Sequence, residues 1–492
     1  MRLKLIKIKE YKNLKDLKIK FIDENIDVFI GNNGSGKTNI YEFILKVFQK
    51  VAQRDNNFEH EFVIEYDIDI DGRFSSVVLY GDGEKINIKI DGNLPKYNTP
   101  IKNYMPKNIV VYYSGNSRRL QSIYSDRFVY MKDEYFPLVF TTLLTSNLEK
   151  NRKFLKDFFH IIAKEDVELS FKVKNYFKLD LYLKQEVIKS YEQEELERYY
   201  EIEHYMADKV DEISFYSHLE SYWSEIENQF NFKITPQKKT RIDFIRNLVR
   251  YANKDILLTN DNKYITFTIT TQQIIEDSLD RYDIEFFKLL FGTYKGNLLQ
   301  IKDIRFNRED IKDKVSYKDL SEGETQFILT QGIIELFNDN ENLFLLDEAD
   351  TYLHPLWQRK IINHLRNSKA DNIHILFTTH SPQTLTHVTK NNIYIIDNSS
   401  DKTNIYNPPK STFGRDINSI VSEAMGIPER PKEIDDLFNK LFQKISLKKF
   451  DEVEEIKQKI LKITENEENF INDELDFVKA NAIIQRMKVL GK

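Results

Sequence analysis

The chain has 492 residues, a formal net charge of −6 and no cysteine. Its length predicts two or three compact units, and the missing cysteine excludes disulfides, thiolate metal sites and a cysteine nucleophile. No apolar run is long enough to cross a membrane and the first residues are too charged for a secretory signal, so we expect a cytoplasmic protein. The negative net charge gives no overall attraction to nucleic acid.

Two short strands are predicted at 2–8 and 17–22, and a glycine-rich loop, GNNGSGKT, follows at 31–38. The loop has an apolar strand before it and helical spacing after it, an order in which backbone N–H groups and a helix N-terminus face phosphate oxygens. We expect Lys37 to reach the β- and γ-phosphates of ATP and Thr38 to bind Mg²⁺. The other nucleotide contacts predicted in this loop are Asn32, Asn33, Gly34, Ser35, Gly36 and Asn39.

Alternating patterns from 62 to 90 are closed by Asp-Gly pairs, which indicate antiparallel hairpins. The alternating Asp67, Asp69 and Asp71 are interpreted as the solvated face of a strand, with a metal site as the alternative. An apolar strand at 108–113 then leads into the polar loop SGNSRRL. This loop is placed either as a ligand-facing loop or as a solvated turn.

From about 136 to 253 the sequence predicts an irregular helical region. It contains an acidic stretch, Gln185 to Glu227, and a basic stretch, Lys233 to Lys254. Both are interpreted as solvated helix faces. The alternative for the basic stretch is contact with a phosphate backbone or an acidic partner.

Two adjacent acids, Asp347 and Glu348, end an apolar stretch suited to a buried parallel strand. We expect Asp347 in the Mg²⁺ shell and Glu348 beside the γ-phosphate, where it would orient or deprotonate the attacking water. A third apolar strand at 374–379 ends at His380, in reach of the γ-phosphate. Glu348, His380 and Lys37 are therefore the predicted catalytic residues.

The segment LSEGETQ at 320–326 opens an apolar helix. Ser321 and Gly323 at its start predict a second anion site. One subunit holds only one nucleotide in its glycine-rich loop, so we expect this second site to serve the nucleotide of a neighbouring subunit. Further on, NPPK at 407–410 predicts a linker, and Glu433 to Lys492 predicts helices interrupted by an acidic loop at 465–474.

These motifs resemble those of the ABC-type ATPases of the RecF, structural-maintenance-of-chromosomes and OLD kind. LSEGE is similar to their LSGGQ signature, LFLLDEAD to Walker B with the D-loop, and TTHSPQ to the switch-histidine loop. The resemblance implies that two subunits enclose two nucleotides, with Ser321 completing the opposite site and Asp350 at the dimer seam. Glu322 and Glu324 depart from the signature, and Gln121 is the candidate for the Q-loop glutamine.

A narrower resemblance, to the PtuA-type ATPases of Septu and Septu-like retron anti-phage systems, covers most of the chain. It rests on the segments YYSGNSRRL, LSEGETQ, DEADTYLHP, FGRDINSI, MGIPERP and AIIQRMKVLGK. The resemblance implies a separate HNH nuclease partner of the PtuB kind, and in retrons also a reverse transcriptase with its RNA/DNA product. The nine histidines of this chain form no H-N-H array, so we expect no nuclease site of its own.

The expected fold class is α/β, an ABC-type P-loop ATPase head with an antiparallel β subdomain. Residues 1–135 and 255–400 are assigned to the head, 136–254 to a helical insertion, and 401–492 to a helical tail for partner or oligomer contact. The expected function is ATP hydrolysis with Mg²⁺, in a homodimer or higher oligomer that holds and regulates a nuclease. The alternatives are a DNA-repair ATPase that binds DNA directly and a nucleotide-gated scaffold with little turnover.

Overall fold

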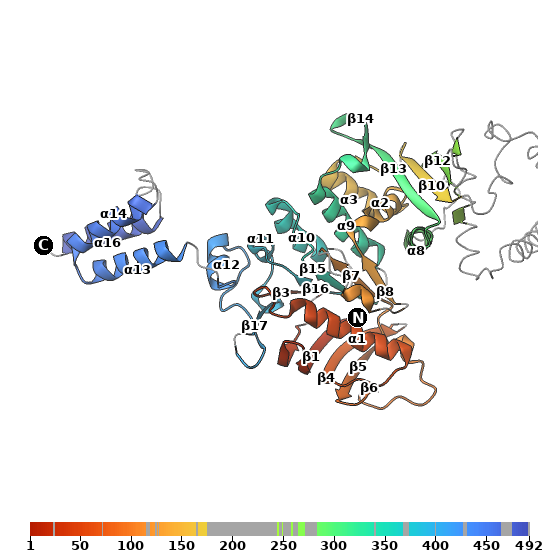
Figure 1. The fold of residues 1–492 in the computed structure, drawn as a ribbon, viewed down its shortest axis with the longest axis horizontal. Coiled ribbons are helices and arrows are strands. Elements are labelled where there is room, and N and C mark those ends of the chain that lie inside the picture. The colour runs from red at the N-terminus through yellow and green to blue at the C-terminus, as the bar shows by residue number, and fades with distance from the viewer. Residues whose placement is uncertain are drawn as a thin grey trace, which may run out of the picture.

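Three β-sheets organise the chain (Figure 1). The computed structural model describes residues 1–22, 25–70, 72–114, 119–123, 125, 127–163, 166–174, 244–245, 248, 257–258, 264–270, 283–338, 341–367, 373–398, 400–426, 431–463 and 475–490. The acidic segments 185–227 and 465–474 therefore lie outside the described residues, as does the basic stretch 233–254 apart from residues 244, 245 and 248. Within the described ranges, no helix has the length and apolar character needed to cross a membrane.

The central sheet has seven strands in the order β18-β17-β3-β16-β15-β7-β8, and only the β17–β18 pair is antiparallel. Every residue of β3, β15 and β16 is buried, because helices cover both faces of the sheet. The four apolar strands predicted from the sequence all lie here. The strands are β3 (Ile26–Ile30), β7 (Asn108–Tyr113), β8 (Phe128–Met131), β15 (Asn342–Asp347), β16 (Ile373–Thr378), β17 (Ile393–Asp397) and β18 (Asn404–Tyr406).

Helix α1 (Lys37–Gln53) packs between one face of the central sheet and a five-stranded antiparallel sheet. Ile40, Phe43 and Phe48 of the helix are fully buried, because both sheets contribute apolar side chains to the same core. The predicted antiparallel β subdomain is thus confirmed. Its strands, in the order β2-β1-β4-β5-β6, are β1 (Arg2–Tyr11), β2 (Leu14–Lys20), β4 (Glu61–Ile70), β5 (Arg73–Asp82) and β6 (Ile86–Ile90).

The alternating aspartates of β4 take part in ordinary strand contacts. Asp67 pairs with Lys4 at 3.3 Å, and Asp69 accepts a hydrogen bond from the backbone N–H of Gly72 at 2.7 Å. Asp71 lies outside the described residues. These contacts agree with a solvated strand face. Within the described part of the chain, no group of three or more His, Cys, Asp or Glu side chains is placed to hold a metal ion.

A second core lies on the other face of the central sheet, under α2, α9 and a third sheet. Figure 1 shows this third sheet with α2, α3 and α8 beside it. Its strands are β9 (Ile161–Ile162), β10 (Glu168–Lys174), β11 (Leu257–Leu258), β12 (Tyr264–Thr270), β13 (Leu299–Arg308) and β14 (Ile311–Ser316). The helices of this region and of the neighbouring head are α2 (Phe136–Leu144), α3 (Glu149–Phe159), α8 (Asp283–Lys295), α9 (Glu322–Leu336), α10 (Pro355–Asn367) and α11 (Pro382–Leu385).

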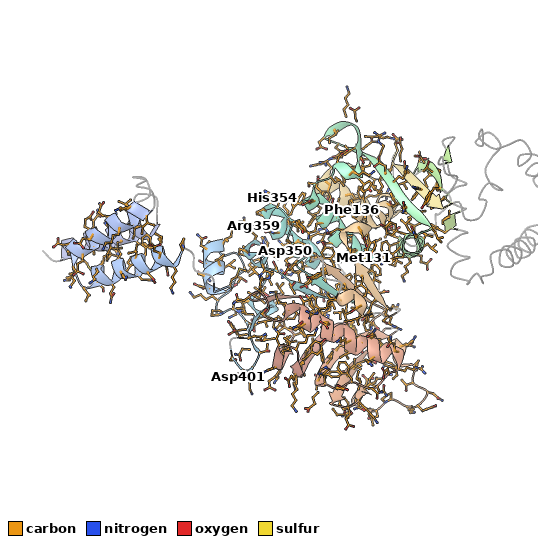
Figure 2. All side chains as sticks on the ribbon, viewed as in Figure 1. Met131, Phe136, Asp350, His354, Arg359 and Asp401 are labelled. Carbon is orange, nitrogen blue, oxygen red and sulfur yellow. The ribbon has the colours of Figure 1, made fainter. Side chains whose placement is uncertain are left out.

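The predicted helical insertion from 136 to 254 has helices α2 and α3 in its described part, but it also contains strand β10. Strand β10 pairs with β12 and β13, through Leu169 opposite Ile269 on one side and Ile304 on the other. The partner strands β12 and β13 follow β10 by about 100 residues or more, so no hairpin turn next to β10 indicates a strand in the sequence. Met131 and Phe136, labelled in Figure 2, lie on either side of the predicted boundary at 135 and belong to the same core.

The prediction of a helical tail beginning at 401 is wrong at its start. Strand β18 completes the central sheet, and the Thr412 hydroxyl donates to the backbone oxygen of Val388 at 2.8 Å. The predicted linker therefore packs on the head up to α12 (Ile417–Glu423). Beyond it, α13 (Lys432–Ser446), α14 (Phe450–Ile463) and α16 (Leu475–Leu490) form a separate apolar cluster, seen away from the sheets in Figure 1.

Candidate nucleotide site

A cavity of about 410 Å³ opens at the carboxyl edge of the central sheet. The glycine-rich loop, the end of β15 and the loop after β16 meet there, because β3, β15 and β16 are parallel neighbours. This is the edge at which parallel α/β sheets bind ligands. The cavity is lined by Asn33, Gly34, Ser35, Gly36, Lys37, Thr38, Asn39, Arg119, Glu348 and His380.

The loop wraps around the Lys37 ammonium, which donates to the backbone oxygen of Gly31 at 2.9 Å and to that of Asn32 at 3.4 Å. Burial lowers the pKa of Lys37. Gly36 precedes α1 with φ 103°, a left-handed conformation that glycine adopts without strain. A Cβ at this position would lie 2.5 Å from the Leu14 side chain. The loop therefore requires glycine here both for its backbone angle and for its close contact with the β1–β2 turn.

Two asparagines far apart in the sequence hold the loop in place. The side-chain amide of Asn13 donates to the Gly34 oxygen at 2.6 Å, and that of Asn398 donates to the Ser35 oxygen at 2.6 Å. The Ser35 hydroxyl is buried and makes no hydrogen bond to any described residue. A phosphate group in the cavity fits this arrangement, because it would supply the acceptor that this hydroxyl lacks.

Thr38 lines the cavity, and its side chain contacts the buried Asp347. The Thr38 hydroxyl donates to Asp347 Oδ2 at 2.8 Å, and the Thr378 hydroxyl donates to Asp347 Oδ1. Burial raises the pKa of Asp347, whereas these hydrogen bonds lower it. A hydroxyl and a carboxylate are the hard oxygen ligands that Mg²⁺ prefers, and nucleotide phosphates commonly complete its shell. Thr38 and Asp347 therefore fit the Mg²⁺ of a bound nucleotide.

Glu348 has φ 53°, a left-handed conformation that is strained for any residue other than glycine. Its backbone N–H is held by the Thr378 oxygen at 3.1 Å and by the Thr378 hydroxyl at 2.9 Å. The side chain reaches into the cavity, with its Oε1 atom 3.5 Å from Nε2 of His380. The hydrogen bond with His380 lowers the pKa of Glu348. The strained backbone thus presents a carboxylate that is ionised at neutral pH.

Replacing Thr378 with Val is expected to lower the free energy of unfolding by about 1–3 kcal/mol, because the buried Asp347 carboxylate loses a donor. ATP turnover should also fall, since the Glu348 backbone loses one of its two acceptors. Thr378→Ser keeps the hydroxyl and should restore both properties. Urea denaturation and phosphate release measure the two effects. Equal loss in the Val and Ser variants would contradict a role for the hydroxyl.

Ser321 and Gly323 lie at the start of α9 and are not among the residues that line the cavity. Ser321 forms a capping box: Glu324 N–H donates to its hydroxyl oxygen at 3.2 Å, while its own N–H and hydroxyl donate to Glu324 Oε2 at 2.9 Å. Arg308 donates to the other Glu324 oxygen at 3.1 Å. The anion site that the sequence predicted is thus occupied by a carboxylate of the same subunit. The Ser-x-x-Glu spacing is the sequence signal for this cap.

Asp350 is only 2% exposed, and Figure 2 shows it within the body of the head. Its carboxylate accepts hydrogen bonds from the hydroxyls of Thr379 and Thr384. Burial raises the pKa of Asp350 to about 6, although these hydrogen bonds oppose the shift. Contact of this side chain with a neighbouring subunit, as predicted from the D-loop resemblance, would require Asp350 to become more exposed.

Sequence reasoning did not assign Arg119 and Asn398 to the site. Arg119 lines the cavity at the end of the polar loop that was placed as either ligand-facing or solvated. Asn398 lies just after β17, and no local pattern marks it as a support for the glycine-rich loop. Gln121, the candidate Q-loop residue, lies in a short helical turn, and its side chain is outside the described part of the chain.

The fold and the cavity define the class of protein as a P-loop ATPase. The chain belongs to the AAA ATPase domain family, AAA_15, which matches residues 1–385.

In sequence, the chain is similar to ATPases of retrons and to a Septu protein. Retron Vc95 probable ATPase of Vibrio cholerae serotype O1 biovar El Tor is 24% identical over 477 residues, 87% of this chain and 79% of that protein. Retron Ec83 probable ATPase of Escherichia coli is 23% identical over 469 residues, 90% and 79% of the two chains. Septu protein PtuA of Bacillus mycoides (strain KBAB4) is 24% identical over 166 residues, 30% and 23% of the two chains.

Among solved structures, the Smc head bound to the C-winged helix domain of ScpA aligns with a TM-score of 0.34 and 13% identity, over 83% of this chain and 98% of that chain. The relatives confirm the resemblance drawn from the motifs: the chain is homologous to retron ATPases over most of its length and to a Septu protein over a shorter part.

Proposed function

We propose that the chain is the ATP-hydrolysing subunit of an anti-phage defence complex, in which it holds and regulates a separate HNH nuclease. The similarity to Retron Vc95 probable ATPase carries this proposal, because it covers 87% of the chain. It therefore reaches past the residues that match the ATPase domain family, which end at 385. Sites of partner contact are expected beyond the ATPase domain, where the separate helical cluster of α13, α14 and α16 lies.

In the proposed reaction, Lys37 and the loop N–H groups bind the β- and γ-phosphates of ATP. Thr38 and Asp347 hold Mg²⁺, which supplies charge neutralisation at the phosphates when it is bound. Glu348 orients and deprotonates the attacking water, and its ionised state suits a proton acceptor. Nε2 of His380 lies 3.5 Å from Oε1 of Glu348. In the proposed reaction His380 donates a hydrogen bond to the γ-phosphate. The shared cavity of Lys37, Thr38, Glu348 and His380 supports these roles, as does the hydrogen bond from Thr38 to Asp347.

The site is proposed to be completed by Ser321 and Gly323 of a neighbouring subunit, in a homodimer or a higher homo-oligomer. The phosphate of the neighbour's nucleotide would then compete with the Glu324 carboxylate for the Ser321 hydroxyl and N–H. Arg308 would still neutralise the Glu324 carboxylate after that exchange, because it donates a hydrogen bond to Glu324 Oε1 at 3.1 Å. ATP binding would in this way be coupled to the closure of two subunits.

Purification of the tagged chain from its native operon tests the proposal. We expect an HNH protein to co-purify and its cleavage of plasmid DNA to change when ATP is added, whereas the chain alone hydrolyses ATP and cuts no DNA. A reverse transcriptase with bound RNA or DNA in the same fraction would identify a retron complex. Salt-sensitive DNA binding by the chain, with no HNH protein in the complex, would instead support the DNA-repair alternative.

A further inference from the structure

Arg119 lines the cavity together with the glycine-rich loop, although it comes from the segment after β7. Among the described residues that line the cavity, Lys37 and Arg119 are the two that carry a permanent positive charge, and Glu348 carries a negative one. ATP with Mg²⁺ brings a net charge of about −2 into such a site. Lys37 and the loop N–H groups balance part of this charge, and a second cation at the same cavity would balance more of it.

The Arg119 side chain donates hydrogen bonds to two side chains of α1 in this structure. Its Nε donates to Glu42 Oε2, and its Nη2 donates to the Asn39 side-chain oxygen. Asn39 is itself a cavity-lining residue, directly after the Thr38 of the glycine-rich loop. The guanidinium is therefore anchored one residue from the proposed Mg²⁺ ligand, at the rim of the phosphate site.

Glu42 does not depend on Arg119 for its charge balance. Lys12 Nζ lies 2.7 Å from both Glu42 oxygens, the Tyr11 hydroxyl donates to Oε1 at 2.8 Å, and Lys46 lies 3.5 Å away. Burial would raise the pKa of Glu42, but the hydrogen bonds from Lys12, Tyr11 and Arg119 bring it down to about 2. Because the carboxylate keeps Lys12 and Tyr11, transfer of Arg119 to another anion leaves no unpaired buried charge.

We propose that Arg119 is a nucleotide-phosphate ligand of its own subunit, which passes from Glu42 and Asn39 to a phosphate oxygen of ATP. The proposal deepens the nucleotide site of the proposed function and rests on it. Arginine suits this role because its planar guanidinium donates two parallel hydrogen bonds to phosphate and stays protonated at all relevant pH values. Glu42 then serves as the resting partner that keeps the guanidinium next to the site.

Arg119→Gln is expected to weaken binding of the fluorescent analogue mant-ATP by about 10- to 100-fold, the usual effect of losing a charge-assisted hydrogen bond. The matched control is Lys12→Gln. Lys12 also pairs with Glu42 and its side chain has the same 42% exposure, but it does not line the cavity. Its mant-ATP affinity should therefore stay within about threefold of wild type. Arg119→Lys should recover only part of the loss, because an ammonium lacks the paired donors.

Steady-state ATP hydrolysis and thermal unfolding of the Arg119 variants distinguish a phosphate ligand from an arginine with a structural role. If Arg119 contacts the bound nucleotide, its loss raises the steady-state KM for ATP and leaves the thermal unfolding midpoint without ATP close to that of wild type. Equal loss of affinity in Arg119→Gln and Lys12→Gln would overturn the proposal, since it would assign both residues to Glu42 alone. Unchanged affinity in Arg119→Gln, with affinity lost in Lys37→Ala, would overturn it and leave the nucleotide site intact. Failure of the wild-type chain to bind mant-ATP would overturn the proposed function itself.

Discussion

Replacing Glu348 with Gln is expected to lower ATP turnover by a factor of about 10² to 10⁴, the usual contribution of a general base. Affinity for ATP should stay within a few-fold of wild type, because the glutamine side chain has nearly the same size and Glu348 is not among the groups proposed to hold the phosphates. The nucleotide-bound oligomer should persist for longer, since its release is proposed to follow hydrolysis. Phosphate release, mant-ATP titration and light scattering after gel filtration measure the three effects.

The matched control for this experiment is Glu84→Gln, an exposed glutamate in the β5–β6 turn of the antiparallel sheet. It removes the same charge far from the cavity-lining residues and should leave turnover unchanged. Equal and slow hydrolysis in the wild type and Glu348→Gln, with assembly still dependent on ATP, would contradict the enzymatic role. That outcome would support the nucleotide-gated scaffold.

Replacing Lys37 with Ala is expected to abolish ATP binding, and with it both hydrolysis and nucleotide-dependent assembly. Without nucleotide the ammonium is desolvated, and its two hydrogen bonds to described residues go to backbone oxygens, so its removal should leave the unfolding midpoint without ATP nearly unchanged. Saturating ATP raises the stability of the wild type by RT ln(1 + [L]/Kd), about 2.7 kcal/mol at 100 times Kd. The variant should show no such rise in a thermal unfolding assay.

Lys46→Ala is the control on the same helix. Lys46 is 39% exposed on its side chain and pairs with Glu42 at 3.5 Å, but it does not line the cavity. Its ATP-dependent stabilisation should match that of the wild type. A Lys37→Ala protein that assembles and responds to ATP like the wild type would refute the proposal that the glycine-rich loop forms half of a shared site.

The sequence predicted those parts of the site that are contiguous in the chain. The glycine-rich loop is a strand, a turn and a helix N-terminus in succession, so its backbone geometry follows from local residues. The strand ending at Asp347 and Glu348 could be predicted for the same reason, because a short apolar run followed by acids is a local pattern. The hairpins of the antiparallel sheet were marked by their Asp-Gly turns.

The local pattern failed where a strand or a side chain depends on a distant partner. The sequence ELSFKVK of β10 alternates, but it lies among helical patterns and pairs with the distant strands β12 and β13.

The capping box of Ser321 is a local feature and could have been predicted from Glu324 three residues later. The second anion site was inferred from Ser321 and Gly323 at a helix N-terminus, and the structure places the Glu324 carboxylate at that position.

The sequence by itself determined the order of the motifs and the chemistry that each one contributes: a lysine and a hydroxyl in a glycine-rich loop, two acids at the end of a strand, and a histidine after the next strand. Only the tertiary structure decided that Thr38 meets Asp347 at 2.8 Å, that Thr378 supports both acids, and that Arg119 shares the cavity. The physical reason is the parallel pairing of β15 with β7 and β16. This pairing brings the carboxyl ends of strands from distant parts of the chain to one edge of the sheet.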